Sequence, residues 1–117
     1  MSAIAVNNEI VRLRLCLSEL SRLTTSRPAS WRKEYIALRR ILNACLARMA
    51  TSVELIPDGD AVRSLVFRLN HLVSLHQAEW PVVRIDLDDP SYMSSRETLA
   101  STIEQIAHEL RKLRSAA

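Results

Sequence analysis

Glycine is nearly absent from this chain of 117 residues, in which Gly59 is the single example. Glycine lets a backbone turn tightly around a phosphate or bend through closely spaced hairpins. Its scarcity disfavours glycine-rich nucleotide loops and hairpin-rich β folds. Long apolar runs are also missing, because the longest stretch without Asp, Glu, Lys or Arg, residues 69–78, is about half of what a bilayer-spanning helix requires. We therefore expect no transmembrane helix and no membrane partner.

Signals for secretion and for metal binding are equally scarce. Residues 1–9 lack the basic region and the long apolar core of a secretory signal, which predicts a cytoplasmic protein. Cys16 and Cys45 lie inside apolar periodic segments and do not have the spacing of metal ligands or of a CxxC motif. We expect two buried, reduced thiols and no cofactor.

Four segments carry apolar residues at alternating spacings of three and four, which is the pattern of a helix packed along one stripe. The stripes are formed by Val6, Ile10, Leu13, Leu17 and Leu20; by Trp31, Tyr35, Leu38, Leu42, Cys45 and Met49; by Val62, Leu65, Leu69, Leu72 and His76; and by Tyr92, Arg96, Leu99, Ile103, Ile106, Leu110 and Leu113. Ser30, Asp60 and Asp89 precede the last three segments as candidate N-caps. Each stripe therefore predicts one helix.

Three apolar positions in every seven favour a globular bundle over a two-stranded zipper. The connecting segments are short, at about residues 25–29, 51–59 and 81–89. We predict a single domain over residues 1–117, folded as an all-α, antiparallel, up-and-down four-helix bundle. A short extended segment, about residues 82–87, is expected before the last helix because apolar and charged residues alternate there. It either lies as a strap over the bundle end or pairs as a strand with another chain.

The net charge of +3 combines two unequal halves. Residues 1–50 hold nine Lys or Arg and three acids, whereas residues 51–117 hold seven Lys or Arg and ten acids. A basic surface on the first two helices fits an acidic partner protein. Nucleic acid is the alternative partner, although both segments are long and evenly amphipathic and lack the short recognition helix of a helix-turn-helix.

The three histidines are the obvious candidates for chemistry. His71 and His76 are about 140° apart around a helix, so they cannot bind one metal ion from the same face. His76 lies on the apolar stripe, where we expect a core-edge histidine with a hydrogen-bond partner. The stripes of the first, second and fourth helices supply no inward-facing carboxylate, which argues against a di-iron centre.

His71 supports an alternative function. It lies on the polar side of its helix near Arg68, and one exposed histidine in the middle of a four-helix bundle is the layout of histidine phosphotransfer modules. Leu75, one turn further on, argues against this function, because docking of a response-regulator partner favours a small side chain there. His108 follows Glu104 by four residues, a spacing that usually gives only slight helix support. We predict no enzyme activity, with His71 as the alternative phosphoacceptor.

Five apolar side chains project away from the predicted stripes, namely Val11, Leu15, Ile36, Phe67 and Leu75. Several such side chains on adjacent turns indicate a covered surface, although a wide core would also bury them. We predict that they bind another protein, and that Arg39 and Arg40 orient an acidic partner. The predicted function is that of a small regulator, adaptor or chaperone that also self-associates.

Overall fold

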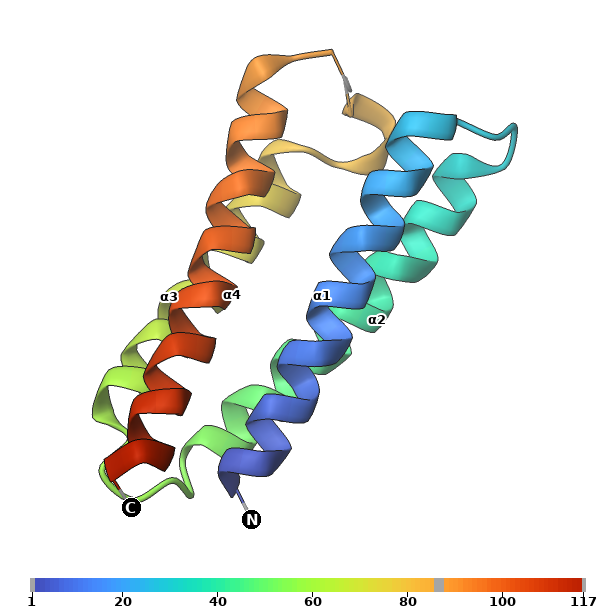
Figure 1. Cartoon of the computed structure of the whole chain (residues 1–117). Coiled ribbons are helices and arrows are strands. Elements are labelled where there is room, and N and C mark those ends of the chain that lie inside the picture. Colours follow the sequence, from blue (N-terminus) through green and yellow to red (C-terminus); the bar gives the residue numbers. More distant parts are fainter. Residues whose placement is uncertain (1, 86–87, 117) are drawn as a thin grey trace.

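Helices account for most of the chain. The computed structural model describes residues 2–85 and 88–116 and contains α1 (Ser2–Ser26), α2 (Trp31–Val53), α3 (Asp60–Glu79) and α4 (Pro90–Ala116). A short 3-10 turn, η1 (Val82–Arg84), lies between α3 and α4, and no strand occurs in these two ranges. The predicted all-α fold is confirmed (Figure 1). No helix, over the residues described, is long and apolar enough to cross a membrane.

The four helices form an antiparallel up-and-down bundle. α1 packs on α2 and α4, and α3 packs on the same two helices, so α1 and α3 occupy diagonal corners. The most extensive contacts lie within the α1–α2 hairpin and within the α3–α4 hairpin. Figure 1 shows the two hairpins side by side, with both termini at one end of the bundle. The bundle measures 48 × 22 × 20 Å.

The helices begin where the predicted N-caps place them, except that α3 begins one residue earlier than predicted. The Asp89 carboxylate accepts the Ser91 backbone N–H at 2.8 Å, as expected for the N-cap of α4. Asp60, predicted as an N-cap, is instead the first residue of α3, and Gly59 is the cap. A Cβ at position 59 would approach Ile56 Cγ2 to 2.9 Å, so a larger residue would have to displace Ile56.

The core divides into two clusters. The main core contains most of the stripe residues and both cysteines, which are buried thiols as predicted. A smaller cluster beside η1 contains Leu20, Leu23, Tyr35, Ile85 and Tyr92. In α3 the buried stripe consists of Val62, Val66, Leu69, Val73 and His76. Leu65 and Leu72, which were predicted at its centre, lie on its flank and are only partly buried.

The connection from α3 to α4 corrects the predicted extended segment at about residues 82–87. Residues 82–84 form η1, only Pro81 and Ile85 on either side have extended backbone angles, and residues 86 and 87 lie outside the described residues. The turn leaves Val83 82% exposed, while Ile85 is buried in the smaller cluster. A strand would place Val83 and Ile85 on the same face. The strand interpretation is therefore wrong for residues 82–85, which fold against the bundle.

Candidate functional site

The side chains predicted to project from the core are all exposed. Their exposed fractions range from 41% at Ile36 to 79% at Phe67, with Val11, Leu15 and Leu75 in between. The alternative of a core wide enough to bury them is wrong. Exposure alone does not assign them a partner, so their arrangement on the bundle decides what they can bind.

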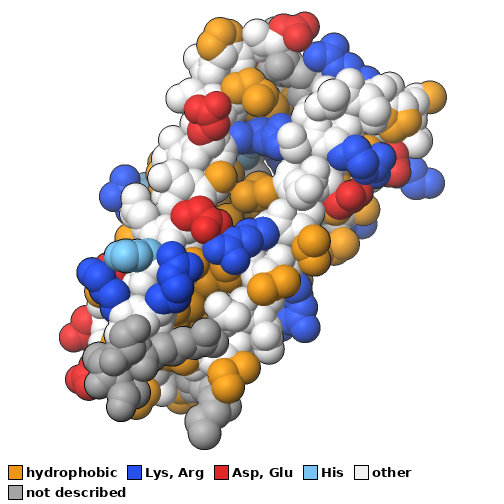
Figure 2. Space-filling model, in the orientation of Figure 1, with side chains coloured by type: hydrophobic (Ala, Val, Ile, Leu, Met, Phe, Trp, Pro, Cys, Tyr) orange, Lys and Arg blue, Asp and Glu red, His pale blue; other side chains and the backbone are white. Residues whose placement is uncertain are grey.

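The exposed apolar side chains lie on three helices and do not form one surface. Val11 and Leu15 lie on the outward side of α1, where the exposed Ile4 extends them into a stripe, which we call the α1 apolar stripe. Phe67 and Leu75 lie on the outward side of α3, at the diagonal corner of the bundle. Figure 2 shows apolar side chains spaced along the exposed side of α1. One flat partner surface cannot cover both helices.

The outward side of α2 combines cations with the exposed apolar side chain Ile36. Arg32, Ile36 and Arg40 are spaced by four residues and therefore lie in a row along the helix, with Lys33 beside them. All are exposed, and neither Lys33 nor Arg40 forms an ion pair with any residue that the structure describes. The Arg32 guanidinium lies over the Trp31 ring, 4.6 Å from its centroid. We call Arg32, Lys33, Ile36 and Arg40 the α2 basic face.

The acids in the first half of the chain do not neutralise this face. Glu9 and Glu19 form ion pairs with arginines outside the α2 basic face. Glu34 accepts a hydrogen bond from Ser30 Oγ at 3.2 Å and forms no ion pair with Lys33 or another cation among the described residues. The cations of the α2 basic face therefore keep their charge available for a partner.

Arg39, predicted to act with Arg40, has a different environment. Its guanidinium is half-buried, donates a hydrogen bond to the backbone carbonyl of Trp80 and lies over the Tyr35 ring, 5.0 Å from the ring centroid. Adjacent residues on a helix point about 100° apart, so one arginine faces the solvent while the other faces inward. Arg39 thus belongs to the interior of the bundle and not to its outward basic face.

A polar cluster in the interior joins α2, α3 and α4. The Tyr35 and Tyr92 hydroxyls are hydrogen-bonded to each other. The His76 ring stacks on Tyr92 with centroids 5.5 Å apart, and the Arg96 guanidinium lies over the Tyr92 ring, 5.8 Å from its centroid. We call Tyr35, Arg39, His76, Tyr92 and Arg96 the inner cluster.

The inner cluster confirms the expected role of His76. Its side chain is buried, and a hydrogen bond joins Nδ1 to Ser95 Oγ at 2.6 Å. Burial, together with the charges of Arg39 and Arg96, lowers the pKa of His76 to about 4. Burial and the neighbouring Tyr35 raise the pKa of Tyr92. At neutral pH His76 is therefore a neutral imidazole and Tyr92 a neutral phenol.

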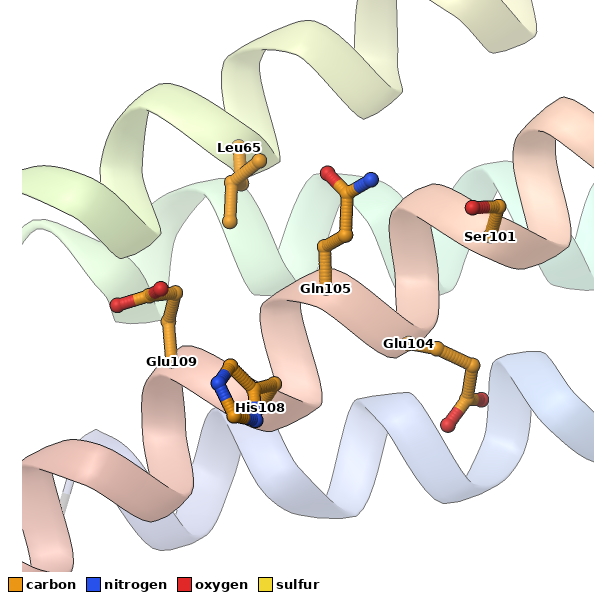
Figure 3. A pocket seen from close by; sticks show the side chains of 6 residues that line it. All are labelled: Leu65, Ser101, Glu104, Gln105, His108 and Glu109. Atoms are coloured by element: carbon orange, nitrogen blue, oxygen red, sulfur yellow. The ribbon is translucent and has the colours of Figure 1, made fainter.

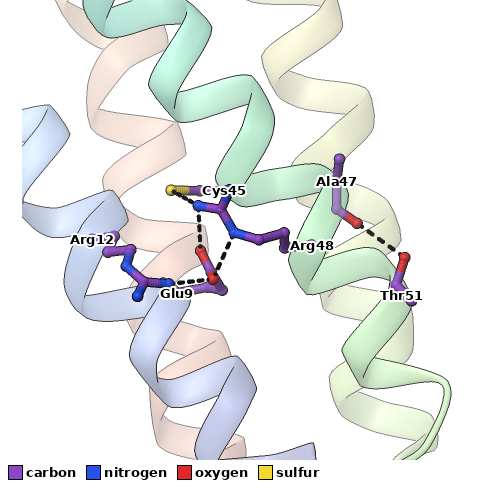
Figure 4. A network of polar contacts seen from close by, with 6 residues as sticks. All are labelled: Glu9, Arg12, Cys45, Ala47, Arg48 and Thr51. Carbon is purple, nitrogen blue, oxygen red and sulfur yellow. Dashed lines mark hydrogen bonds and ion pairs between the residues drawn. The ribbon is translucent and has the colours of Figure 1, made fainter.

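Glu9 is a buried charge that sequence reasoning missed. Its side chain is only 5% exposed, which corrects the expectation that the first helix supplies no inward-facing carboxylate. Arg48 donates two hydrogen bonds to it, at 2.8 and 3.1 Å, and Arg12 donates one at 2.5 Å (Figure 4). The Arg48 guanidinium holds the pKa of Glu9 below its usual range. Glu9 thus joins α1 to α2 through arginine and is not available to a metal ion.

The remaining histidines are exposed. His71 lies on the outward side of α3, as predicted. His108 borders an open depression of about 470 Å³ that includes Leu65 of α3 (Figure 3). Glu104, one turn before His108, is bound by Arg14 of α1 at 2.6 and 2.8 Å. Among the residues described, no group of three or more His, Cys, Asp or Glu could hold a metal ion.

Comparisons with known proteins do not assign the chain to a class. Family models, curated proteins and solved structures give no significant match. The fold defines an all-α four-helix bundle. Its function is therefore inferred from its own surfaces and its own interior.

Proposed function

We propose that the chain is a small, non-enzymatic protein-binding module whose α2 basic face binds an acidic segment of another protein. The observation that supports this most is that Lys33 and Arg40 flank the exposed Ile36 and form no ion pair within the described chain. Protein interfaces commonly surround an apolar centre with polar and charged side chains that orient the partner. The α2 basic face has this composition.

The partner's chemistry follows from this composition. A row of cations along one helix suits a segment that carries Asp or Glu on both sides of an apolar residue. Arg32 and Arg40 can pair bidentately with carboxylates, whereas Lys33 acts as a point charge. A cytoplasmic regulator, adaptor or chaperone is the kind of protein that such a module would be.

The α1 apolar stripe is assigned, in the same proposal, to a second copy of the chain. Ile4, Val11 and Leu15 are spaced by seven and four residues, which is the spacing of a helix–helix contact. Asn8 and Ser18 complete this face, so it is uncharged from residue 4 to residue 18. Two copies can bring such faces together without like-charge repulsion.

Affinity capture with a matched control tests the proposed partner surface. Tagged wild-type protein, Lys33→Glu/Arg40→Glu and Arg68→Glu/Arg111→Glu are each incubated with lysate of the source organism, and the recovered proteins are quantified by mass spectrometry. The control variant has the same change in net charge, but its substitutions lie on exposed positions of α3 and α4. We expect a stoichiometric acidic protein with wild type and control, and at least about tenfold less with the α2 variant.

Two results would contradict this proposal. Equal recovery of the same proteins by both variants would show that the α2 basic face is not the binding surface. Recovery that disappears after nuclease treatment would assign the arginine-rich surface to nucleic acid, whose binding is dominated by phosphate contacts.

A further inference from the structure

The inner cluster contains more hydrogen-bond donors than acceptors. Arg39 donates to the Trp80 carbonyl oxygen. Arg96 donates to Thr24 Oγ1 at 3.2 Å. A guanidinium carries five N–H donors, so most donors of both arginines remain available. The Trp80 indole N–H is buried and has no partner in the part of the chain that the structure describes, and the Trp80 ring contacts Tyr92 of the inner cluster edge-on, with ring centroids 5.5 Å apart.

Charge is unbalanced at the same place. Neither Arg39 nor Arg96 forms an ion pair within residues 2–85 and 88–116. His76, which lies close to both, is neutral, because burial and the two guanidinium charges lower its pKa. Both arginines are partly buried, where a charge is less well solvated than at an exposed position. The inner cluster therefore lacks an anionic acceptor.

A small cavity and an open groove both reach Arg96. The cavity, of about 20 Å³, is bordered by Arg39, His76 and Arg96 and has room for about one water-sized atom. The groove, of about 250 Å³, is bordered by Leu17, Met93 and Arg96. Leu17 and Arg96 border both spaces. Figure 2 shows a hollow between α1 and α4, with Lys or Arg side chains at its rim.

We propose that this groove and cavity form a binding site for a small organic monocarboxylate with a short apolar chain. The carboxylate is held by Arg96, whose planar guanidinium pairs with both of its oxygens, and it lies on the side of Arg96 that faces Arg39. The apolar chain lies in the groove on Leu17 and Met93. The ligand is short, because pockets for drug-sized molecules measure about 300–1,000 Å³.

Glu97 sets the charge of the acceptable ligand. Its exposed side chain also borders the groove. A second carboxylate at the far end of the ligand would be repelled there, so the site favours monocarboxylates over dicarboxylates. This inference does not rest on the proposed function, because the site lies between α1 and α4 and shares no residue with the α2 basic face.

The direct test is a titration of ¹⁵N-labelled full-length protein with hexanoate, followed through the Trp80 indole N–H signal by NMR. Hexanamide, which has the same chain but no charge, is the control ligand. We expect a saturable shift of the Trp80 signal with hexanoate only. Arg96→Gln should weaken binding at least about tenfold, because it removes a charge-assisted pair. Glu97→Gln should strengthen hexanoate binding.

A matched variant separates binding from folding. Arg111→Gln changes an exposed arginine of the same helix and should bind hexanoate as wild type does. Circular dichroism of Arg96→Gln should show wild-type helix content, and Arg96→Lys, which keeps the charge, should bind with intermediate affinity. Equal shifts with hexanoate and hexanamide would overturn the inference. An absence of saturable binding in the wild type, or unchanged affinity in Arg96→Gln, would do the same.

Discussion

At the scale of single residues, the contact between Tyr35 and Tyr92 joins two helices that are not neighbours in the bundle. The two tyrosines come from α2 and α4, which occupy diagonal corners of the bundle. Their hydroxyls meet in the interior, where both side chains are fully buried. A tyrosine is long enough to reach the middle of a bundle, and its hydroxyl then needs a polar partner. The pair therefore ties the two hairpins together at the end that carries the inner cluster.

The first prediction concerns this pair of hydroxyls. Tyr35→Phe should lower the free energy of unfolding by about 1–3 kcal/mol, because it leaves the Tyr92 hydroxyl buried without its partner. Tyr92→Phe should have a similar effect. The double variant should lose less than the sum of the two single changes, since neither hydroxyl is then left unpaired. Urea unfolding of the four proteins measures this coupling, and strictly additive losses would show that the hydroxyls do not stabilise each other.

His76 makes stability depend on pH in a defined window. Its pKa falls from an ordinary 6.5 to about 4 in the folded protein, mainly through burial. The unfolded chain therefore takes up a proton below about pH 6.5, whereas the folded chain does so only near pH 4. The stability contributed by neutral His76 is present above pH 6.5 and is lost as pH falls toward 4, by about 3 kcal/mol in total.

Urea unfolding between pH 7 and pH 4 checks the His76 prediction. His76→Phe should remove most of the pH dependence in this window. His71→Gln, a change at an exposed histidine of the same helix, should leave that dependence as in the wild type. Equal pH dependence in all three proteins would assign the effect to other groups, such as Glu9 or Glu104, whose pKa values are lowered from 4.5 on folding and which therefore also lose stabilising interactions as pH falls toward 4.

At the scale of helices, periodic spacing predicted the four helices and most of the buried stripe in each. A stripe of five or more residues identifies a helix reliably, because helical spacing places all of these apolar side chains on one face. The segment around residues 82–87 carried only three alternating apolar residues, which is too few to distinguish a strand from a turn after a proline. Its description as extended was accordingly wrong for residues 82–84, whereas Ile85 has extended backbone angles.

Contacts between helices were harder to predict than the helices themselves. Glu9 directly precedes the stripe residue Ile10, and its burial depends on Arg48, which lies on another helix. The opposite roles of Arg39 and Arg40 follow from which side of α2 meets α3. The residues of the inner cluster come into contact only when α2, α3 and α4 are packed together. The spacing of residues within one helix carries no information about any of these partners.

The α1 apolar stripe carries a prediction about self-association. Leu15→Asp should weaken self-association, because it places a charge in an uncharged apolar face, and helix content should remain nearly unchanged. Leu13→Asp, at a fully buried position two residues away, should instead unfold the bundle. Phe67→Asp, on the outward side of α3, should leave the oligomeric state as in the wild type.

Sedimentation velocity and circular dichroism of the four proteins distinguish these outcomes. Loss of helix content in Leu15→Asp would show that Leu15 belongs to the core and not to an exposed stripe. A wild-type protein that remains monomeric over the concentration range tested would refute self-association through α1.

At the scale of the whole molecule, ion pairs decide where the excess positive charge is available. Arg14 pairs with Glu104 of α4, and Arg27 pairs with Asp88 at 3.2 Å, so cations of α1 and of the loop after it are used between the two halves of the chain. Lys33 and Arg40 of the α2 basic face form no such ion pair among the described residues. The positive charge of the first half is therefore concentrated on one outward side, where it can attract an acidic partner.

The affinity of the captured partner, measured across salt concentrations for wild type and Lys33→Glu/Arg40→Glu, tests the central claim most directly. At low salt the variant should bind at least about tenfold more weakly. The difference should shrink as salt rises, because the screening length falls from about 10 Å at 0.1 M to about 3 Å at 1 M. Equal affinities of the two proteins at every salt concentration would contradict the claim that the α2 basic face binds an acidic partner.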